Sequence, residues 1–189
     1  MMRRFRALRL LLVGLALAGV GVAAEPNRLW LDVPFVRQSK NGCGPASIAM
    51  VIQYWRLQSA SRETAAGRLP GYDGDPVTIE RAVYSKEARG TAGSAMQRYF
   101  EQAGFRAFVF KGEWTDLEHH LSQGRPLIVA LREPRSNHYV VVSGLDGPQV
   151  VLVNDPAQRK LLKVDRASFE RAWNGTGNWT LLAVPRQNP

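Results

Sequence analysis

Apolar residues recur with a helical period in the first half of the chain and form short continuous runs in the second half. Four of them are spaced i, i+3, i+4 and i+7, namely Ile48, Val51, Ile52 and Trp55. This spacing puts all four on one face, so it predicts a buried helix from about Cys43 to Arg56. Pro45 is compatible only with the first turn of that helix, because proline has no N–H to donate in a helix interior.

The rest of the pattern predicts further helices and a series of strands. Helices are expected at 91–105, closed by Gly104, at 114–124, with Thr115 as N-cap and Gly124 as the stop, and at 165–173. Strands are expected at 106–110, 126–132, 138–145, 150–155, 160–164 and 179–184, and a short edge strand or extended entry segment is expected at 29–38. The segment 58–93 is the least regular, with short helical candidates at 62–68 and 78–85.

The order of these elements favours one fold class. A helical first half before a strand-rich second half indicates an α+β fold, with an antiparallel sheet packed on the long helix, rather than alternating βαβ units. The 189 residues are 45% hydrophobic and 22% charged, which is ordinary for a soluble globular domain with its own core. The sequence shows no internal repeat and no linker. We therefore expect one domain over residues 25–189.

The first 24 residues have the pattern of an export signal. A basic segment, MMRRFRALR, precedes an apolar run that ends in small residues, LLLVGLALAGVGVAA. We expect cleavage after Ala24 and a periplasmic or secreted domain. The apolar run is shorter than the roughly 20 residues of a membrane-spanning helix, and an uncleaved membrane anchor is the alternative. Cleavage would lower the net charge from +9 to +5, because this segment holds four arginines and no acidic residue.

Cys43 is the only cysteine of a chain that is expected to be exported. In an oxidising compartment cysteines are usually paired, so a single thiol is expected to be either buried or chemically used. Its position at the start of the predicted helix favours the thiolate, because the first-turn N–H groups are unpaired and the helix dipole is positive there. A glycine on each side leaves room for a substrate carbonyl. A small buried packing residue is the competing interpretation.

A thiolate nucleophile needs a base and a group that orients the base. Of three histidines, His138 opens an apolar strand, whereas His119 and His120 are adjacent in a polar helix. If Asp146 and Gly147 form a two-residue turn, His138 lies directly opposite Asp155, with Cβ atoms roughly 4.5–5.5 Å apart. A four-residue turn makes the pair diagonal but keeps both side chains on one face.

An oxyanion hole would complete the site, since it supplies donors for the negative charge that develops on the substrate. Gln38 lies five residues before Cys43, in a loop that must bend back to start the helix. Its side-chain amide could join the backbone N–H of Cys43 as a donor. Glutamine is also common in loops, which is the plain alternative.

Four separated segments, in order, resemble the papain-like cysteine peptidases of the bacteriocin-processing, double-glycine leader peptidase type: VPFVRQSKNGCGPASIAMVIQYW, GRPLIVAL, NHYVVVSG and VVLVNDP. The resemblance runs from about Leu31 to the C-terminus. It implies that Cys43 attacks the substrate and that Gln38 completes the oxyanion hole. It implies further that His138 is general base and then acid, oriented by Asp155.

This chain departs from that family in two respects. Four residues separate Gln38 from Cys43, one fewer than expected in the leader peptidases proper. Those peptidases are typically cytoplasmic domains fused to a transporter, whereas this chain carries an export pattern. The resemblance therefore predicts the papain-like fold and the four site residues better than it predicts cleavage after a double glycine.

The sequence predicts a cysteine peptidase that acts on a peptide or protein substrate. An acyl-transfer enzyme with the same residues and a catalytically silent peptide-binding module are the alternatives. No cofactor is implied, and the adjacent His119 and His120 lack the spacing of metal ligands. Lys and Arg are scattered, without a basic run or interleaved aromatic residues, so nucleic-acid binding is not expected.

Overall fold

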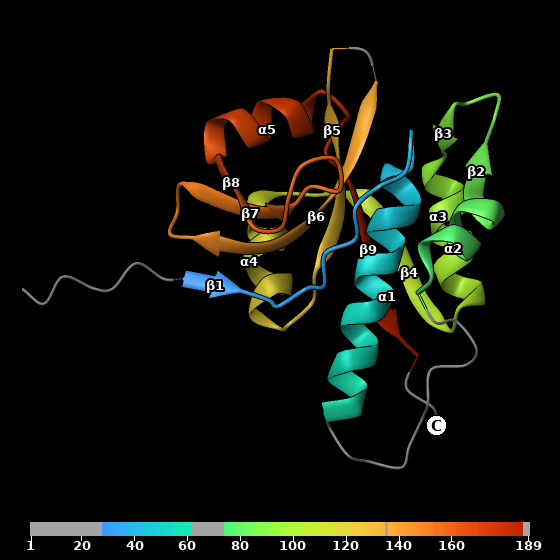
Figure 1. The fold of residues 1–189 in the computed structure, drawn as a ribbon. Coiled ribbons are helices and arrows are strands. Elements are labelled where there is room, and N and C mark those ends of the chain that lie inside the picture. Colours follow the sequence, from blue (N-terminus) through green and yellow to red (C-terminus); the bar gives the residue numbers. More distant parts are fainter. Residues whose placement is uncertain (1–27, 62–73, 135, 187–189) are drawn as a thin grey trace, which may run out of the picture.

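The computed structural model describes residues 28–61, 74–134 and 136–186 (Figure 1). The expected signal at 1–24 and the helical candidate at 62–68 lie outside the described residues. The elements follow the order β1 (Arg28–Trp30), α1 (Cys43–Ser61), α2 (Pro76–Val83), β2 (Tyr84–Ser85), β3 (Gly90–Thr91), α3 (Gly93–Gln102), β4 (Phe105–Lys111), α4 (Trp114–Ser122), β5 (Leu127–Arg132), β6 (Asn137–Asp146), β7 (Val150–Asn154), β8 (Leu162–Asp165), α5 (Arg166–Asn174) and β9 (Trp179–Pro185). None of the described helices has the length and hydropathy needed to cross a membrane.

One antiparallel sheet organises the fold, with strand order β4-β9-β5-β6-β7-β8 and with β1 paired to β6. α1, α2 and α3 pack with one cluster of buried side chains, and α4 and α5 pack with a second cluster. Figure 1 shows α1 standing between the strands and the α2–α3 pair. The predicted α+β class, with an antiparallel sheet on the long helix, is confirmed.

α1 is buried on most of its surface because it has neighbours on two sides, the sheet and the α2–α3 pair. A helix that is apolar nearly all round is typical of such a central position. α1 extends to Ser61, beyond the predicted end at Arg56, because no helix-breaking residue follows where the apolar pattern stops. Gly44 lets β3 approach the helix start, since a Cβ on Gly44 would lie 2.7 Å from the Cβ of Thr91.

The short edge strand or extended entry segment expected at 29–38 is observed as β1, which pairs with β6, and a connector that follows it. One prediction about an element end was wrong. Thr115 is not the N-cap of α4. Glu113 takes that place, and its backbone N–H donates to the Asp116 carboxylate at 2.8 Å. Gly124 follows the helix with a φ of 72°, a left-handed conformation that suits the predicted glycine stop.

The predicted two-residue turn between β6 and β7 was also wrong. Leu145 pairs with Val151, so the connection is longer than Asp146–Gly147. The register then shifts between Val142 and Gly144, which adds one residue to β6 as a β-bulge. Beyond the bulge Val141 pairs with Asn154, the register that the predicted four-residue turn would give.

The bulge decides which side chains share a face near the end of the hairpin. Side chains alternate along a strand, so one extra residue exchanges the two faces. If the pairing register found next to the turn continued to the end of the hairpin, His138 and Asp155 would lie on opposite faces of the sheet. The bulge at Ser143 brings both side chains to one face. The residue that follows β1 holds the bulge, since Leu31 N–H donates to the Ser143 carbonyl at 2.7 Å.

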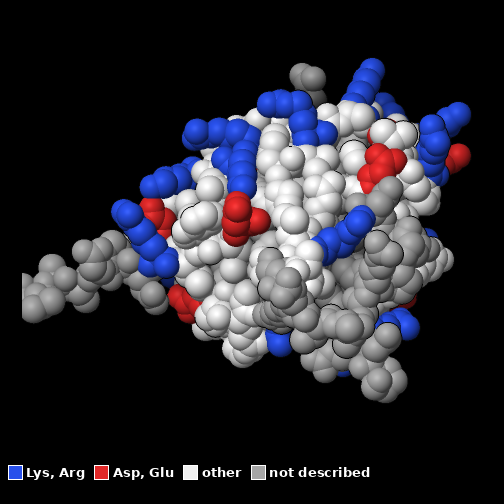
Figure 2. All heavy atoms as spheres, turned by 60° about the horizontal axis from the view of Figure 1, so that its bottom comes forward, with Lys and Arg blue, Asp and Glu red and all other residues white. Residues whose placement is uncertain are grey.

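Charged side chains on the surface are partly paired with each other. On the face that Figure 2 shows, Lys and Arg lie mainly along the upper rim, with acidic side chains between them. Asp32 pairs with Lys160, and Asp146 pairs with both Arg28 and Lys163. Several cations of the described surface are therefore balanced by a neighbouring carboxylate.

Candidate active site

Cys43 is the first residue of α1, and its free thiol is partly exposed. The helix starts from a tight turn in which Gly42 N–H donates to the Ser39 carbonyl at 3.0 Å and Asn41 has a φ of 60°. A Cβ on Gly42 would come 2.4 Å from Ser39 Oγ, so a side chain at this position would displace the Ser39 hydroxyl. The thiol thus lies at the positive end of a 19-residue helix.

His138 and Asp155 lie where β6 and β7 separate. The last residue pair between these strands is Val141 and Asn154. Past this pair, β6 keeps β5 on one side, and the start of α1 lies on the other, where Ser47 Oγ donates to the Tyr139 carbonyl at 3.4 Å. The helix start therefore occupies the place that β7 has left.

Hydrogen bonds join Cys43, His138 and Asp155 into one chain. Nε2 of His138 donates to Oδ1 of Asp155 at 2.7 Å, and a second side-chain hydrogen bond connects His138 with Cys43. Since Nε2 is used by Asp155, Nδ1 is the ring nitrogen that faces the thiol. His138 is 7% exposed and Asp155 is 4% exposed. The structure therefore brings three of the predicted residues together, with His138 in contact with both of the others.

The Asp155 carboxylate is held by the turn that follows β7. Gln158 N–H donates to the Asp155 carbonyl at 2.9 Å, which closes a β-turn with Pro156 in the position that proline favours. Ala157 N–H donates to Oδ1 at 2.9 Å, and the Gln158 side chain donates to Oδ2 at 2.6 Å. Both carboxylate oxygens therefore accept hydrogen bonds.

The electrostatics favour a charged His138. Burial alone would lower the pKa of His138, but the hydrogen bonds with Asp155 and Cys43 and the charges of both outweigh it and raise the pKa to about 10. Tyr139 lies nearby, and burial together with the charge of Cys43 raises its pKa to about 12. An imidazolium is thus stabilised, whereas a second negative charge beside the thiol is disfavoured.

Asp155 is kept ionised by its donors. Burial would raise the pKa of its carboxyl, but the hydrogen bond and charge of His138, with the donors of Ala157 and Gln158, hold the pKa below its ordinary value. The carboxylate therefore faces His138 in its charged form.

The backbone of Gln38 is hydrogen bonded next to the Cys43–His138–Asp155 chain. Its N–H donates to the Pro156 carbonyl at 3.0 Å, one residue beyond Asp155. Its side-chain Oε1 is buried and has no hydrogen-bond partner among the described residues. The short gap between Gln38 and Cys43 is spanned by the tight turn at 39–42.

Sequence reasoning gave no role to two residues beside this group. Asn154 is fully buried and joins two connectors, because Nδ2 donates to the Val33 carbonyl at 3.0 Å and Oδ1 accepts from Leu161 N–H at 2.9 Å. A polar residue at the end of an apolar strand was the available signal. Gln158 was signalled only by the turn sequence DPAQ, which does not reveal where the amide points.

The antiparallel α+β fold and the thiol–imidazole–carboxylate chain define a class, the papain-like cysteine peptidases. The chain belongs to the Peptidase_C39 like family, whose model matches residues 30–181. The resemblance stated from the sequence is thereby confirmed.

Solved structures with a similar fold are peptidase domains. A double glycine motif protease from an AMS/PCAT transporter, in complex with the leader peptide, is 21% identical with a TM-score of 0.59, over 85% of this chain and 96% of that one. The peptidase domain of Streptococcus ComA, a bi-functional ABC transporter, is 18% identical with a TM-score of 0.62, over 82% and 98%. A C39-like peptidase from Bacillus anthracis is 20% identical with a TM-score of 0.55, over 85% and 99%. None of the curated protein sequences compared with this chain matches it.

Proposed function

We propose that this cysteine peptidase hydrolyses a peptide or amide bond with Cys43 as nucleophile. His138 takes the thiol proton and later protonates the leaving amine, and Asp155 keeps the imidazole oriented. Water then attacks the acyl-enzyme, with His138 as base, and releases the acid product and the free thiol. The observation that carries this proposal is the hydrogen-bonded chain from Cys43 through His138 to Asp155.

The oxyanion of the tetrahedral intermediate would be held by Cys43 N–H and the side-chain amide of Gln38. First-turn N–H groups have no partner within their helix, so Cys43 N–H is a suitable donor. The Gln38 backbone is anchored to Pro156, beside the His138–Asp155 pair, which supports its place at the site. Its side-chain amide supplies NH2 donors of the kind that an oxyanion hole uses.

The substrate is a peptide or protein outside the cytoplasm in this proposal. The complex of a structural neighbour with its leader peptide supports a peptide substrate. The basic and apolar segments of residues 1–24 support export to the periplasm or the medium.

Thiol alkylation tests the proposed nucleophile without knowledge of the substrate. We expect iodoacetamide to label Cys43 near neutral pH at least about tenfold faster than it labels a free cysteine in an unfolded peptide. His138→Ala should remove this advantage, and His119→Ala should not. Equal labelling rates in the wild type and His138→Ala would overturn the catalytic assignment.

A comparison of exported-protein N-termini between wild-type and Cys43→Ala cells identifies the substrate. New N-termini that depend on Cys43 support hydrolysis. Products in which the acyl part is joined to an amine would replace hydrolysis by acyl transfer. An unchanged set of N-termini and products would contradict both and leave a peptide-binding module.

A further inference from the structure

Gln158 lies outside β7, on an exposed turn, yet its side chain reaches the buried Asp155 carboxylate. Its Nε2 donates to Oδ2 at 2.6 Å, while Oδ1 of the same carboxylate accepts from His138 at 2.7 Å and from Ala157 N–H at 2.9 Å. Among the described residues, Gln158 is the one whose side chain donates to Oδ2. The two oxygens therefore have separate partners.

We propose that Gln158 is a positioning residue, which fixes the rotation of the Asp155 carboxylate so that Oδ1 stays aligned with His138 Nε2. This inference rests on the proposed role of the Cys43–His138–Asp155 chain. A carboxylate held at one oxygen only can rotate about its terminal bond, which is a soft torsion. A donor on the second oxygen removes that freedom, and charge-assisted hydrogen bonds are the stronger ones.

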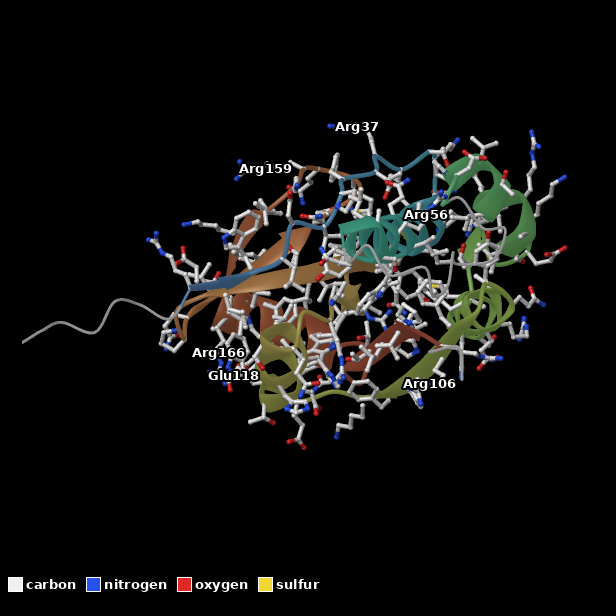
Figure 3. All side chains as sticks on the ribbon, turned by 90° about the horizontal axis from the view of Figure 1, so that it is seen from below. Arg37, Arg56, Arg106, Glu118, Arg159 and Arg166 are labelled. Carbon is white, nitrogen blue, oxygen red and sulfur yellow. The ribbon has the colours of Figure 1, made fainter. Side chains whose placement is uncertain are left out.

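The turn that carries Gln158 is itself held on both sides. Gln158 N–H donates to the Asp155 carbonyl at 2.9 Å, and Asp155 N–H donates to the Arg159 carbonyl at 3.1 Å. From the neighbouring connector, an Arg37 guanidinium nitrogen donates to the Gln158 carbonyl at 3.2 Å. Figure 3 shows Arg37 and Arg159 on the same rim of the molecule. The Gln158 amide therefore starts from a fixed backbone.

Few other charges face this group in the described structure. His138 meets Cys43 from α1 and Asp155 from the turn after β7. Arg37 bonds to the Gln158 backbone, and Lys160, which follows the turn, pairs with Asp32. The orientation of Asp155 is thus sensitive to the neutral Gln158 amide.

The test replaces Gln158 by methionine, which has nearly the same shape and no donor. Gln123→Met is the matched control, because Gln123 is also exposed and its amide nitrogen is also hydrogen bonded to a side chain, in this case His119 at 3.0 Å. Cys43 labelling by iodoacetamide is measured at about pH 6, where it depends on proton transfer to His138, and at about pH 10, where hydroxide removes the thiol proton. Circular dichroism and thermal unfolding show that each variant is folded.

We expect Gln158→Met to slow labelling about tenfold at about pH 6 and to leave the rate at about pH 10 unchanged, with Gln123→Met equal to the wild type at both. In an NMR titration the pKa of His138 should fall in Gln158→Met, and that of His120 should not move. A general structural disturbance would instead lower both labelling rates. If His138→Ala slows labelling and Gln158→Met does not, the positioning role is overturned while the proposed function stands. If neither variant changes the rate, both are overturned.

Discussion

His138 and His120 are the same residue type in two different settings. His138 lies at the start of β6, hydrogen bonded to a buried carboxylate and to the Cys43 thiol. His120 lies on α4, with its ring beside Phe110 and His119, and its Nδ1 is buried without a partner among the described residues. Burial, aided by the charges of His119 and Arg125, lowers the pKa of His120, whereas the pKa of His138 is raised to about 10.

This difference shows what turns a buried histidine into a candidate base. Burial opposes the charged ring at both positions. The direction of the pKa shift follows the acidic partner. Asp155 is hydrogen bonded to His138, whereas Asp116 acts on His120 through its charge alone and raises the pKa of His120 too weakly to compensate. A test of the difference should therefore remove the partner, change the pH or replace the ring.

Removal of the partner charge has the largest expected effect. Asp155→Asn keeps the shape of the side chain but presents a neutral group to His138, so the imidazolium loses its counterion. We expect the pKa of His138 to fall and kcat/KM for a peptide substrate to drop about a hundredfold. The rate is measured on a substrate found from the N-terminus comparison, with His120→Leu as the control. An Asp155→Asn enzyme with wild-type kcat/KM would show that the carboxylate does not act on His138.

The second-largest expected effect is the change in stability with pH that His138 causes. The pKa of His138 rises from 6.5 in the unfolded chain to about 10, so the folded protein is stabilised below about pH 6.5 and loses this contribution as pH rises toward 10. We expect the free energy of unfolding to fall between about pH 7 and 10 by about 2 kcal/mol more in the wild type than in His138→Ala. Urea unfolding at several pH values measures it. Parallel curves would contradict the raised pKa.

Replacement of His120 should have the smallest effect of the three changes. The contribution of His120 to stability should change with pH in the opposite direction to that of His138. The lowered pKa of His120 means that the unfolded chain binds its proton more readily, so this residue costs stability as pH falls below about 6.5. His120→Leu removes the unpaired Nδ1, and we expect it to leave activity unchanged and to raise stability near pH 5 by up to about 1 kcal/mol. Thermal unfolding near pH 5 and pH 8 checks this. A loss of activity would mean that α4 contributes to the site.

Local patterns were enough for most of the elements. The start of α1 at Cys43 follows from Pro45 and the apolar spacing, and Gly124 ends α4 as its position indicated. The Thr115 prediction failed because Asp116 is placed to accept a hydrogen bond from the Glu113 backbone. A cap depends on which side chain completes the bond, and more than one residue near the start of α4 was suitable.

The register of the β6–β7 hairpin was the part of the site that local pattern could not decide. Asp146–Gly147 has the composition of a two-residue turn, but the chain continues further before β7 begins. The bulge at Ser143 depends on Leu31, which follows β1, lies more than a hundred residues earlier in the chain and donates to the Ser143 carbonyl. A contact so distant in sequence leaves no local signal.

The residue types of the site and their order can be read from the amino-acid sequence alone: a lone thiol at a helix start, a histidine that opens an apolar strand and an aspartate that closes the next one. These follow from composition and periodicity, which act over a few residues. Tertiary packing places the start of α1 where β6 and β7 separate and brings His138 and Asp155 to one face. It also puts the Gln158 amide on the second carboxylate oxygen. Hydrogen bonds depend on distances of a few tenths of an ångström, and those distances are set by packing between segments that are far apart in the chain.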